Sequence, residues 1–292
     1  MTKEFVNASP LASDETLLIL GAGFSGQQIA LLGKSLGMKV LRTRRALEKE
    51  FADLVFDSES KTLPPKDVLR SVTHLISCIP PDPSGKDPVL SSMGEELKQM
   101  PIKWAGYLST TGVYGNCNGR WVSELDIPNP QQERSKRRLA CELSWQESGL
   151  PAQILRLPGI YGPGRSALEM LKKGKAKMVD KPNQVFSRIH VDDIAGATFH
   201  LINLASNGFK PDVVNIADDL PTSNLDVVRY GASLLNIPVP PIESFEVAAK
   251  NMSKMALSFW EENRRVSNKM LRDEIGYSLI HPDYKSGLRS CL

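Results

Sequence analysis

The sequence predicts an α/β fold in which helices cover both faces of a parallel sheet. Short apolar runs alternate with amphipathic segments in the first half of the chain, the pattern of repeated strand–helix units. Beyond residue 158, prolines and glycines cluster and the elements become shorter, which predicts a smaller C-terminal α+β lobe. We expect a mobile tail over residues 1–15, a sheet domain over 16–160, and a substrate lobe over 161–292 that is interleaved with the sheet.

The expected strands are short aliphatic and β-branched runs, and the expected helices carry apolar residues at helical spacing. The strands are residues 17–20, 38–41, 54–56, 72–79, 104–108, 152–157, 185–189 and 213–216. The helices are residues 25–36, 132–147, 167–173, 193–204, 245–259 and 268–275. A further helix is expected to run to Leu235, with Thr222 or Ser223 as its cap. Gly37 and Gly276 are expected to end the first and the last helix.

Composition and charge exclude several functional classes. The 292 residues carry 36 basic and 33 acidic side chains, a net charge of +3, which is too small for a nucleic-acid-binding stripe. No apolar run reaches the roughly 20 residues of a membrane span, and the N-terminus lacks the apolar segment of a secretion signal. The four cysteines form no CxxC pair, so the sequence shows no zinc or redox motif. Their scatter along the chain favours a reducing compartment. We therefore expect a cytoplasmic protein that binds neither nucleic acid nor membranes.

A glycine-rich turn directly follows the first expected strand and opens the first expected helix. It reads Gly21-Ala-Gly23-Phe24-Ser25-Gly26. The first glycine allows the tight turn, the second lets a pyrophosphate approach the backbone, and the third permits close packing of helix and strand. The N–H groups and the positive dipole end at the helix start favour phosphate. In this context the motif predicts a dinucleotide site of the Rossmann type rather than an ordinary turn.

The end of the second expected strand indicates the type of dinucleotide. An NAD site has an acidic residue about 20 residues after the glycines, which holds the ribose hydroxyls. Here the chain carries Arg42, Arg44 and Arg45 instead, and guanidinium groups suit a 2′-phosphate. We therefore expect NADP(H) as the cofactor. Asp57, after the third strand, is expected either to accept a hydrogen bond from the adenine amino group or to cap a turn.

Several later segments resemble signatures of the short-chain dehydrogenase/reductase superfamily, in its extended and atypical branches. Leu108-Ser-Thr-Thr-Gly-Val-Tyr-Gly115 is similar to the motif SS–x–x–VYG. Arg156-Leu-Pro-Gly-Ile-Tyr-Gly-Pro-Gly164 is similar to RPxxxYGPG, and Arg188-Ile-His-Val-Asp-Asp193 to FIHVDD. The stretch from residue 265 to 277 looks like that of atypical members described as nucleotide-sugar epimerases or dehydratases. The resemblance covers residues 17–288 and implies a Rossmann sheet with a small substrate lobe.

The resemblance also implies a catalytic Ser/Thr–Tyr–Lys set. The hydroxyl polarises the substrate oxygen, the tyrosine transfers a proton, and the lysine binds the nicotinamide ribose and lowers the tyrosine pKa. Thr110 matches the first position and Lys136 the lysine. The tyrosine position holds Gln132, whose amide supplies no acidic proton. By the same resemblance, Pro158 is expected to line the cofactor site.

The missing tyrosine leaves the proton donor open. Tyr114, Tyr161 and the thiol of Cys78 are candidate replacements; the two tyrosines match family positions that are structural or line the substrate. Asp87 resembles an acidic residue typical of the atypical branch, and is expected to act as a base or to cap the helix that begins near residue 88.

Other chemistries and assemblies are disfavoured. His190-Val-Asp-Asp193 fits no common metal cage, so we expect no metal site. The chain contains no GxSxG elbow and no Ser–His–Asp order, which argues against a hydrolase. The expected helix over residues 132–147 carries many charged side chains, and charged residues are rare in the core of a dimer interface. We therefore expect a monomer or a weak homodimer.

Two functions remain. The first is an NADP(H)-dependent enzyme of the epimerase/dehydratase or reductase type that acts on a small polar substrate, such as a nucleotide sugar. Thr110, Lys136 and the PGIYGPG segment favour it. The alternative is an NADP(H)-binding redox sensor or assembly protein without turnover, which Gln132 favours.

Overall fold

A seven-stranded parallel sheet forms the centre of the computed structural model, which describes residues 15–47 and 50–292. The strand order β11-β7-β5-β4-β1-β2-β3 reverses beside β1, and every neighbouring pair is parallel. This is the predicted Rossmann sheet. Residues 1–14 of the expected tail lie outside the described residues. The strands are β1 (Thr16–Leu20), β2 (Lys39–Arg44), β3 (Leu54–Val55), β4 (His74–Ser77), β5 (Trp104–Thr110), β7 (Ala152–Leu157) and β11 (Val213–Asn215).

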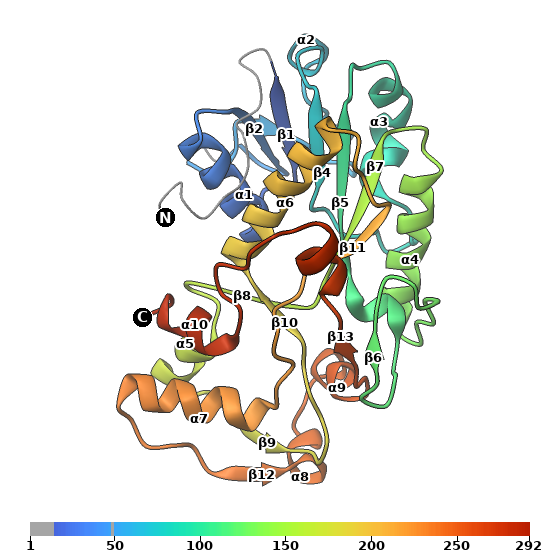
Figure 1. Cartoon of the computed structure of the whole chain (residues 1–292). Coiled ribbons are helices and arrows are strands. Elements are labelled where there is room, and N and C mark those ends of the chain that lie inside the picture. The colour runs from blue at the N-terminus through green and yellow to red at the C-terminus, as the bar shows by residue number, and fades with distance from the viewer. Residues whose placement is uncertain (1–14, 48–49) are drawn as a thin grey trace.

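Helices cover both faces of this sheet, as predicted (Figure 1). Helices α1 (Phe24–Ser35) and α6 (Val191–Ser206) pack on one face, over a core that includes Ile29 and Phe199. On the other face, Trp145 and Cys141 of α4 (Glu133–Gln146) pack with Val89 of α3 (Pro88–Lys98). The short helix α2 (Lys66–Leu69) connects β3 to β4. The two apolar cores explain why the central strands are buried on both sides.

The smaller lobe lies below the carboxyl ends of the sheet strands (Figure 1). Its helices are α5 (Ala167–Lys172), α7 (Asn224–Leu235), α8 (Phe245–Ala249), α9 (Lys254–Trp260) and α10 (Tyr284–Arg289). The chain also forms three two-stranded parallel ladders outside the central sheet: β8 (Gly159–Tyr161) with β10 (Arg188–His190), β9 (Met178–Asp180) with β12 (Ile242–Ser244), and β6 (Trp121–Val122) with β13 (Arg265–Val266). Helix α6 and strand β11 pack with the sheet, although they lie between lobe segments in the sequence, so the chain passes back and forth between the two parts. The domain boundary at residue 160 remains a prediction from the sequence.

Two sequence predictions of local structure were wrong, and one strand is shifted. The helix expected over residues 245–259 is two helices, because the Ser253 hydroxyl accepts a hydrogen bond from the Ala256 N–H at 3.2 Å and starts α9 anew. The helix expected over 268–275 is a π-helical turn (Met270–Glu274). The strand expected over 185–189 is present as β10, shifted to Arg188–His190, where it pairs with β8.

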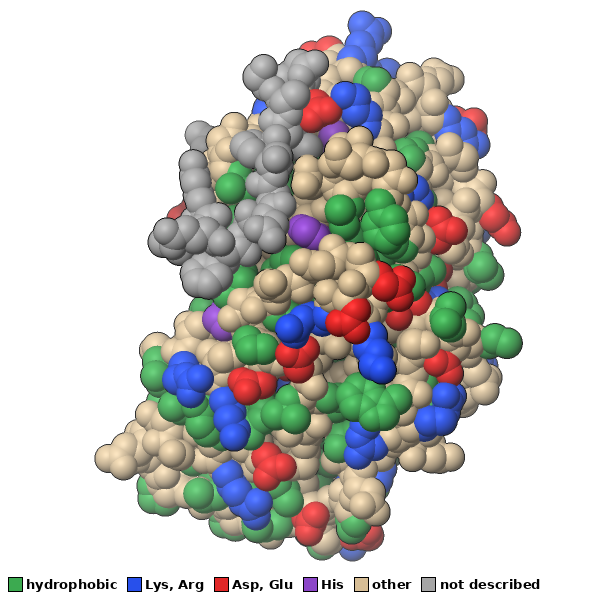
Figure 2. Space-filling view, viewed as in Figure 1, with side chains coloured by type: hydrophobic (Ala, Val, Ile, Leu, Met, Phe, Trp, Pro, Cys, Tyr) green, Lys and Arg blue, Asp and Glu red, His purple; other side chains and the backbone are tan. Residues whose placement is uncertain are grey.

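The described surface carries charges of both signs. Basic and acidic side chains are intermingled on the face shown in Figure 2. Among the described residues, we find no helix that combines the length and the apolar composition needed to cross a bilayer.

Candidate dinucleotide and active site

The glycine turn connects β1 to α1 at the carboxyl edge of the sheet. Gly21 has a φ of +80°, and a Cβ there would lie 2.6 Å from the Cγ1 atom of Ile79, so only glycine fits. A Cβ on Gly26 would lie 3.1 Å from Ile19 Cγ2 and 3.2 Å from the Gly21 carbonyl oxygen, which is the close packing that the motif predicts. Gly23 is the N-cap and has no side chain to occupy the first N–H groups of α1. Those groups can therefore bind a phosphate.

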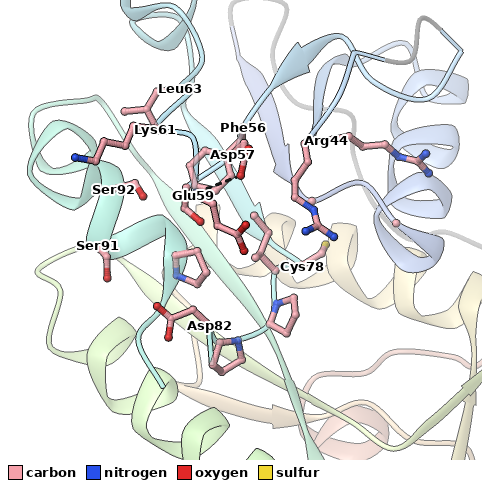
Figure 3. Close-up of a pocket in the computed structure, with 18 of the residues that line it drawn as sticks. Arg44, Phe56, Asp57, Glu59, Lys61, Leu63, Cys78, Asp82, Ser91 and Ser92 are labelled. Atoms are coloured by element: carbon pink, nitrogen blue, oxygen red, sulfur yellow. Dashed lines mark hydrogen bonds between the residues drawn. The ribbon is translucent and has the colours of Figure 1, made fainter. Parts of the chain in front are cut away.

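A cavity of about 1080 Å³ opens beside this turn. Its walls come from the glycine turn, the end of β2, the segment after β3, and the Cys78–Pro83 segment after β4 (Figure 3). Such a position, at the carboxyl ends of strands next to β1, is where doubly wound sheets bind ligands. The volume is at the upper end of the range usual for small-molecule sites.

The three arginines at the end of β2 have different environments. Arg42 is buried and pairs with the Asp53 carboxylate through Nε at 3.0 Å and Nη2 at 3.1 Å. It also donates to Gln27 Oε1, so it holds the β2–α1 corner and is not brought to the cavity. Arg44 and Arg45 do line the cavity. Arg44 donates from Nε to the Ala22 carbonyl oxygen at 2.9 Å, and its guanidinium lies 5.0 Å from the ring centroid of Phe51.

Asp57 caps a turn, one of the two roles expected for it, and it also lines the cavity. Its carboxylate accepts a hydrogen bond from the Glu59 N–H at 3.1 Å, which caps the turn after β3. It also lines the cavity, opposite Arg44 in Figure 3. The Ser60 hydroxyl, followed by neighbouring backbone N–H groups and Arg45, lowers the pKa of Asp57. The group is therefore charged at neutral pH and able to accept a hydrogen bond from a bound ligand.

Of the remaining predicted cofactor residues, Phe24 and Ser25 belong to the turn, and Pro158 lies on another segment. Phe24 and Ser25 are half-buried in the first turn of α1, and the Phe24 ring centroid lies 5.4 Å from the guanidinium carbon of Arg165. Phe24 borders a second hollow beside Arg44 rather than the main cavity. Pro158 is half-buried between β7 and β8.

The predicted catalytic residues are not brought together. Thr110 ends β5 and is half-buried, and its hydroxyl accepts a hydrogen bond from the Gly112 N–H at 3.1 Å. Lys136 is exposed on α4, and its amine pairs with Glu133 of the preceding turn at 2.7 Å. Gln132 is the N-cap residue of α4 and donates to Glu261 at 2.9 Å. The ammonium group expected at the nicotinamide ribose therefore faces solvent instead.

Arg138 is the cation of α4 that does face the sheet, and the sequence analysis overlooked it. Its Nη1 atom donates to the Leu108 carbonyl oxygen of β5 at 2.7 Å. Its positive charge opposes the burial that raises the pKa of Cys78 to about 12, so the two side chains are near each other. Its Nε atom is buried without a hydrogen-bond partner among the described residues. The signal that could have found it is helix phase, since Arg138 lies three residues after buried Ser135 and four before buried Glu142.

The candidate proton donors are occupied by structural contacts. The Tyr114 hydroxyl donates to Asn215 at 2.8 Å, and the Tyr161 hydroxyl donates to the Asp283 carbonyl oxygen at 3.3 Å. Asp87 caps α3 by accepting from the Val89 and Leu90 N–H groups, and it also accepts from the Trp145 indole. Of the two roles expected for Asp87, a base or a helix cap, the structure shows the helix cap. Cys78 lines the cavity, where burial raises the pKa of its thiol to about 12 and keeps it protonated.

Comparison with known proteins agrees with this architecture. The model of the NAD-dependent epimerase/dehydratase family matches residues 91–217. A protein of unknown function from Silicibacter pomeroyi is 35% identical, with a TM-score of 0.84 over 94% of this chain and 97% of that one. A proposed NAD-dependent epimerase/dehydratase from Methylobacillus flagellatus is 25% identical, with a TM-score of 0.71 over 95% and 97% of the two chains.

Two further proteins extend the comparison. Human epimerase family protein SDR39U1, solved with NADPH, shares the fold with a TM-score of 0.70 at 17% identity, over 94% of this chain and 98% of that one. The uncharacterized protein y4nG of Sinorhizobium fredii is 26% identical over 167 residues, which are 52% of this chain and 41% of y4nG. This chain therefore spans less than half of y4nG. With its parallel sheet, its glycine turn and the family model that matches residues 91–217, the chain is similar to the NAD-dependent epimerase/dehydratase family, and it shares its fold with the solved members of that family.

Proposed function

We propose that this protein is an NADP(H)-dependent enzyme of the epimerase or reductase type that acts on a small polar substrate such as a nucleotide sugar. The observation that carries the proposal is the cavity, which joins an uncapped helix start at Gly23 to Arg44 and Arg45. The helix start suits the pyrophosphate. The two arginines suit the 2′-phosphate, whose two negative charges match guanidinium groups better than carboxylates.

In this proposal Arg138 replaces the lysine at the nicotinamide ribose. Its guanidinium is anchored to β5 at Leu108, two residues before Thr110. Thr110 polarises the substrate oxygen, and the nicotinamide supplies the hydride chemistry when the cofactor is bound. Arg138 remains charged at every accessible pH, so it serves to bind and to stabilise charge rather than to transfer a proton.

The surroundings of Arg134 favour an anionic substrate. Arg134 stacks on Phe259, with its guanidinium carbon 3.9 Å from the ring centroid. Burial, together with the positive charge of nearby Arg264, lowers its pKa, while Glu262 raises it. Arg264 in turn donates to the Gly115 carbonyl oxygen, just beyond the turn that follows β5. Two guanidiniums that share one carboxylate leave a positive charge, which suits the phosphates of a nucleotide sugar.

Calorimetric titration of the purified chain with NADPH, NADP⁺, NADH and NAD⁺ tests the cofactor. We expect selective NADP(H) binding, after which nucleotide sugars and carbonyl compounds are screened for turnover. A chain that binds none of the four dinucleotides would contradict the proposal.

Alanine substitutions should distinguish the contribution of Arg138 to NADPH binding from that of Lys136. Arg138→Ala should weaken NADPH binding about tenfold, the effect of one charge-assisted hydrogen bond. Lys136→Ala should leave the dissociation constant within about twofold, because its amine is exposed and pairs with Glu133 of its own helix. Both constants are measured by calorimetry. If the two substitutions changed the dissociation constant equally, the proposal that Arg138 binds the nicotinamide ribose in place of Lys136 would be wrong.

A second candidate is an NADP(H)-binding sensor or assembly protein without turnover. It is favoured by the structural hydrogen bonds of the Tyr114 and Tyr161 hydroxyls and by Gln132 at the usual tyrosine position. Tight NADPH binding with no oxidation of the cofactor and no turnover across the substrate screen would support this candidate over the enzyme.

A further inference from the structure

A buried cluster of two histidines and one aspartate lies where the small lobe meets the sheet. His190 ends β10, Asp192 is in the first turn of α6, and His281 lies in the segment before α10. The three residues are at most 9% exposed. One nitrogen or oxygen atom from each lies within 4.8 Å of the corresponding atoms of the other two. The sequence analysis missed the cluster because His281 follows Asp192 by 89 residues.

The distances within the cluster are close to those of a metal site. Asp192 Oδ2 lies 3.6 Å from His190 Nδ1 and 3.4 Å from His281 Nε2. A tetrahedral zinc ion with bonds of 2.0–2.2 Å separates its ligand atoms by about 3.3–3.5 Å. Two edges of the tetrahedron are therefore nearly formed. The third edge joins the two histidine nitrogens, and the ligand atoms of the three residues all lie within 4.8 Å of one another.

Hydrogen bonds on the far side of His190 determine which of its nitrogens carries the proton. The Ser290 hydroxyl donates to the Gly287 carbonyl oxygen at 2.8 Å, and the Cys291 thiol donates to the same oxygen. The Ser290 oxygen, 3.2 Å from His190 Nε2, therefore accepts a hydrogen bond from that nitrogen. The lone pair of a neutral His190 is thus on Nδ1, the nitrogen nearer to Asp192.

The Asp192 carboxylate is oriented in the same way. Its Oδ1 atom accepts a hydrogen bond from Gln28 Nε2 on α1 at 2.6 Å. This leaves Oδ2 for the two imidazoles. The backbone N–H of Asp192 donates to His190 Nδ1 at 3.2 Å, and this helix-capping bond would have to be shared or lost when an ion binds. Outer hydrogen bonds from a serine and a glutamine that orient the ligand atoms are typical of metal sites.

We propose that His190, Asp192 and His281 bind a Zn²⁺ ion, with water as the fourth ligand. Two imidazole nitrogens and one carboxylate oxygen suit zinc. The ion would attach the segment around residue 281 to β10 and α6, and through Gln28 to α1, the helix that follows the glycine turn. The proposal does not depend on which dinucleotide the cavity binds.

The test uses the full chain, stripped of metal with a chelator and then titrated with ZnCl₂ by calorimetry. Elemental analysis of the dialysed sample gives the number of ions retained. We expect one zinc ion per chain and a higher melting temperature with zinc than without it. His281→Gln and Asp192→Asn should each weaken zinc binding about 100-fold or more. The reason is that the loss of a residue that merely orients a ligand already weakens metal binding by about 10- to 100-fold, and these two residues bind the ion directly. The matched control His74→Gln removes a buried imidazole of β4 and should bind zinc like the unchanged chain.

Substitution with Co²⁺ provides a second measurement that does not require a variant to fold. A four-coordinate site of nitrogen and oxygen ligands should give intense visible absorption without a sulfur charge-transfer band. The variant Cys291→Ser checks the nearby thiol, 3.8 Å from His190 Nε2, and should keep the spectrum unchanged. The proposal is overturned if the unchanged chain binds no zinc, or if His281→Gln binds it as tightly as His74→Gln. A strong sulfur-to-cobalt band would overturn this ligand set in favour of cysteine.

Discussion

Arg44→Ala is expected to weaken NADPH binding about 30- to 100-fold while changing NADH binding less than about threefold. The two cofactors differ only in the 2′-phosphate, so the difference isolates the contact with that group. Arg44 ends β2 and is held beside the turn by its Nε hydrogen bond to the Ala22 carbonyl oxygen. A charge-assisted contact from an arginine held in this way contributes about 2–3 kcal/mol.

Calorimetry at one fixed ionic strength measures both dissociation constants, because phosphate contacts are screened by salt. Arg44→Lys should give an intermediate loss, since lysine keeps the charge but not the planar fork. The control Arg70→Ala removes an exposed arginine at the end of α2 and should change neither constant. If Arg44→Ala weakens NADH as much as NADPH, the 2′-phosphate assignment is wrong, and Asp57 and Glu59, which also line the cavity, would be candidates to hold the ribose of NAD.

Glu142→Ala is expected to destabilise the fold by about 3–5 kcal/mol, the usual effect of breaking a buried ion pair from one side. Glu142 is 1% exposed and accepts hydrogen bonds from Arg156 Nη2 at 2.7 Å and from the Ser109 hydroxyl at 2.5 Å. Arg156 is itself 5% exposed. Its guanidinium would remain buried and charged in the variant, without the carboxylate that now compensates it.

Urea denaturation followed by circular dichroism measures this loss, with an unchanged slope as the sign that only stability has shifted. Glu133→Ala is the matched control, because it removes an exposed glutamate of the same helix, whose ion pair with Lys136 lies on the surface; the urea midpoint of this variant should be unchanged. The double variant Glu142→Leu/Arg156→Met should recover much of the stability, since it removes both charges together. A loss below about 1 kcal/mol for Glu142→Ala would mean that water reaches Arg156 when the carboxylate is removed.

The parts of the site that local sequence predicted are those built from neighbouring residues. The run before Gly21 forms β1, and the glycines that follow need their conformational freedom within a few residues. Arg44 and Arg45 reach the cavity because they follow directly from the end of β2. Arg42 does not, since the loop that follows β2 brings Asp53 back against it. That return depends on how the loop folds, which strand periodicity does not specify.

The assignment of Lys136 shows a second limit. Residues two apart on a helix point about 200° apart, so Lys136 and Arg138 cannot face the same side. The motif spacing favoured Lys136, whereas the packing of Cys141, Glu142 and Trp145 against the sheet turns Arg138 inward. Helix phase is set by all the buried positions of α4 together, and one matched position did not reveal it.

By itself, the sequence determined the sheet, the two covering layers of helices, the glycine turn and the similarity to the epimerase/dehydratase family, because each depends on periodicity or on residues close together in the chain. Only the tertiary structure decided that Asp87 caps α3, that Arg138 faces β5, and that His281 meets His190 and Asp192. These contacts join segments that are far apart in the chain, or depend on the rotation of a helix. The folded chain specifies both through the packing of its apolar cores.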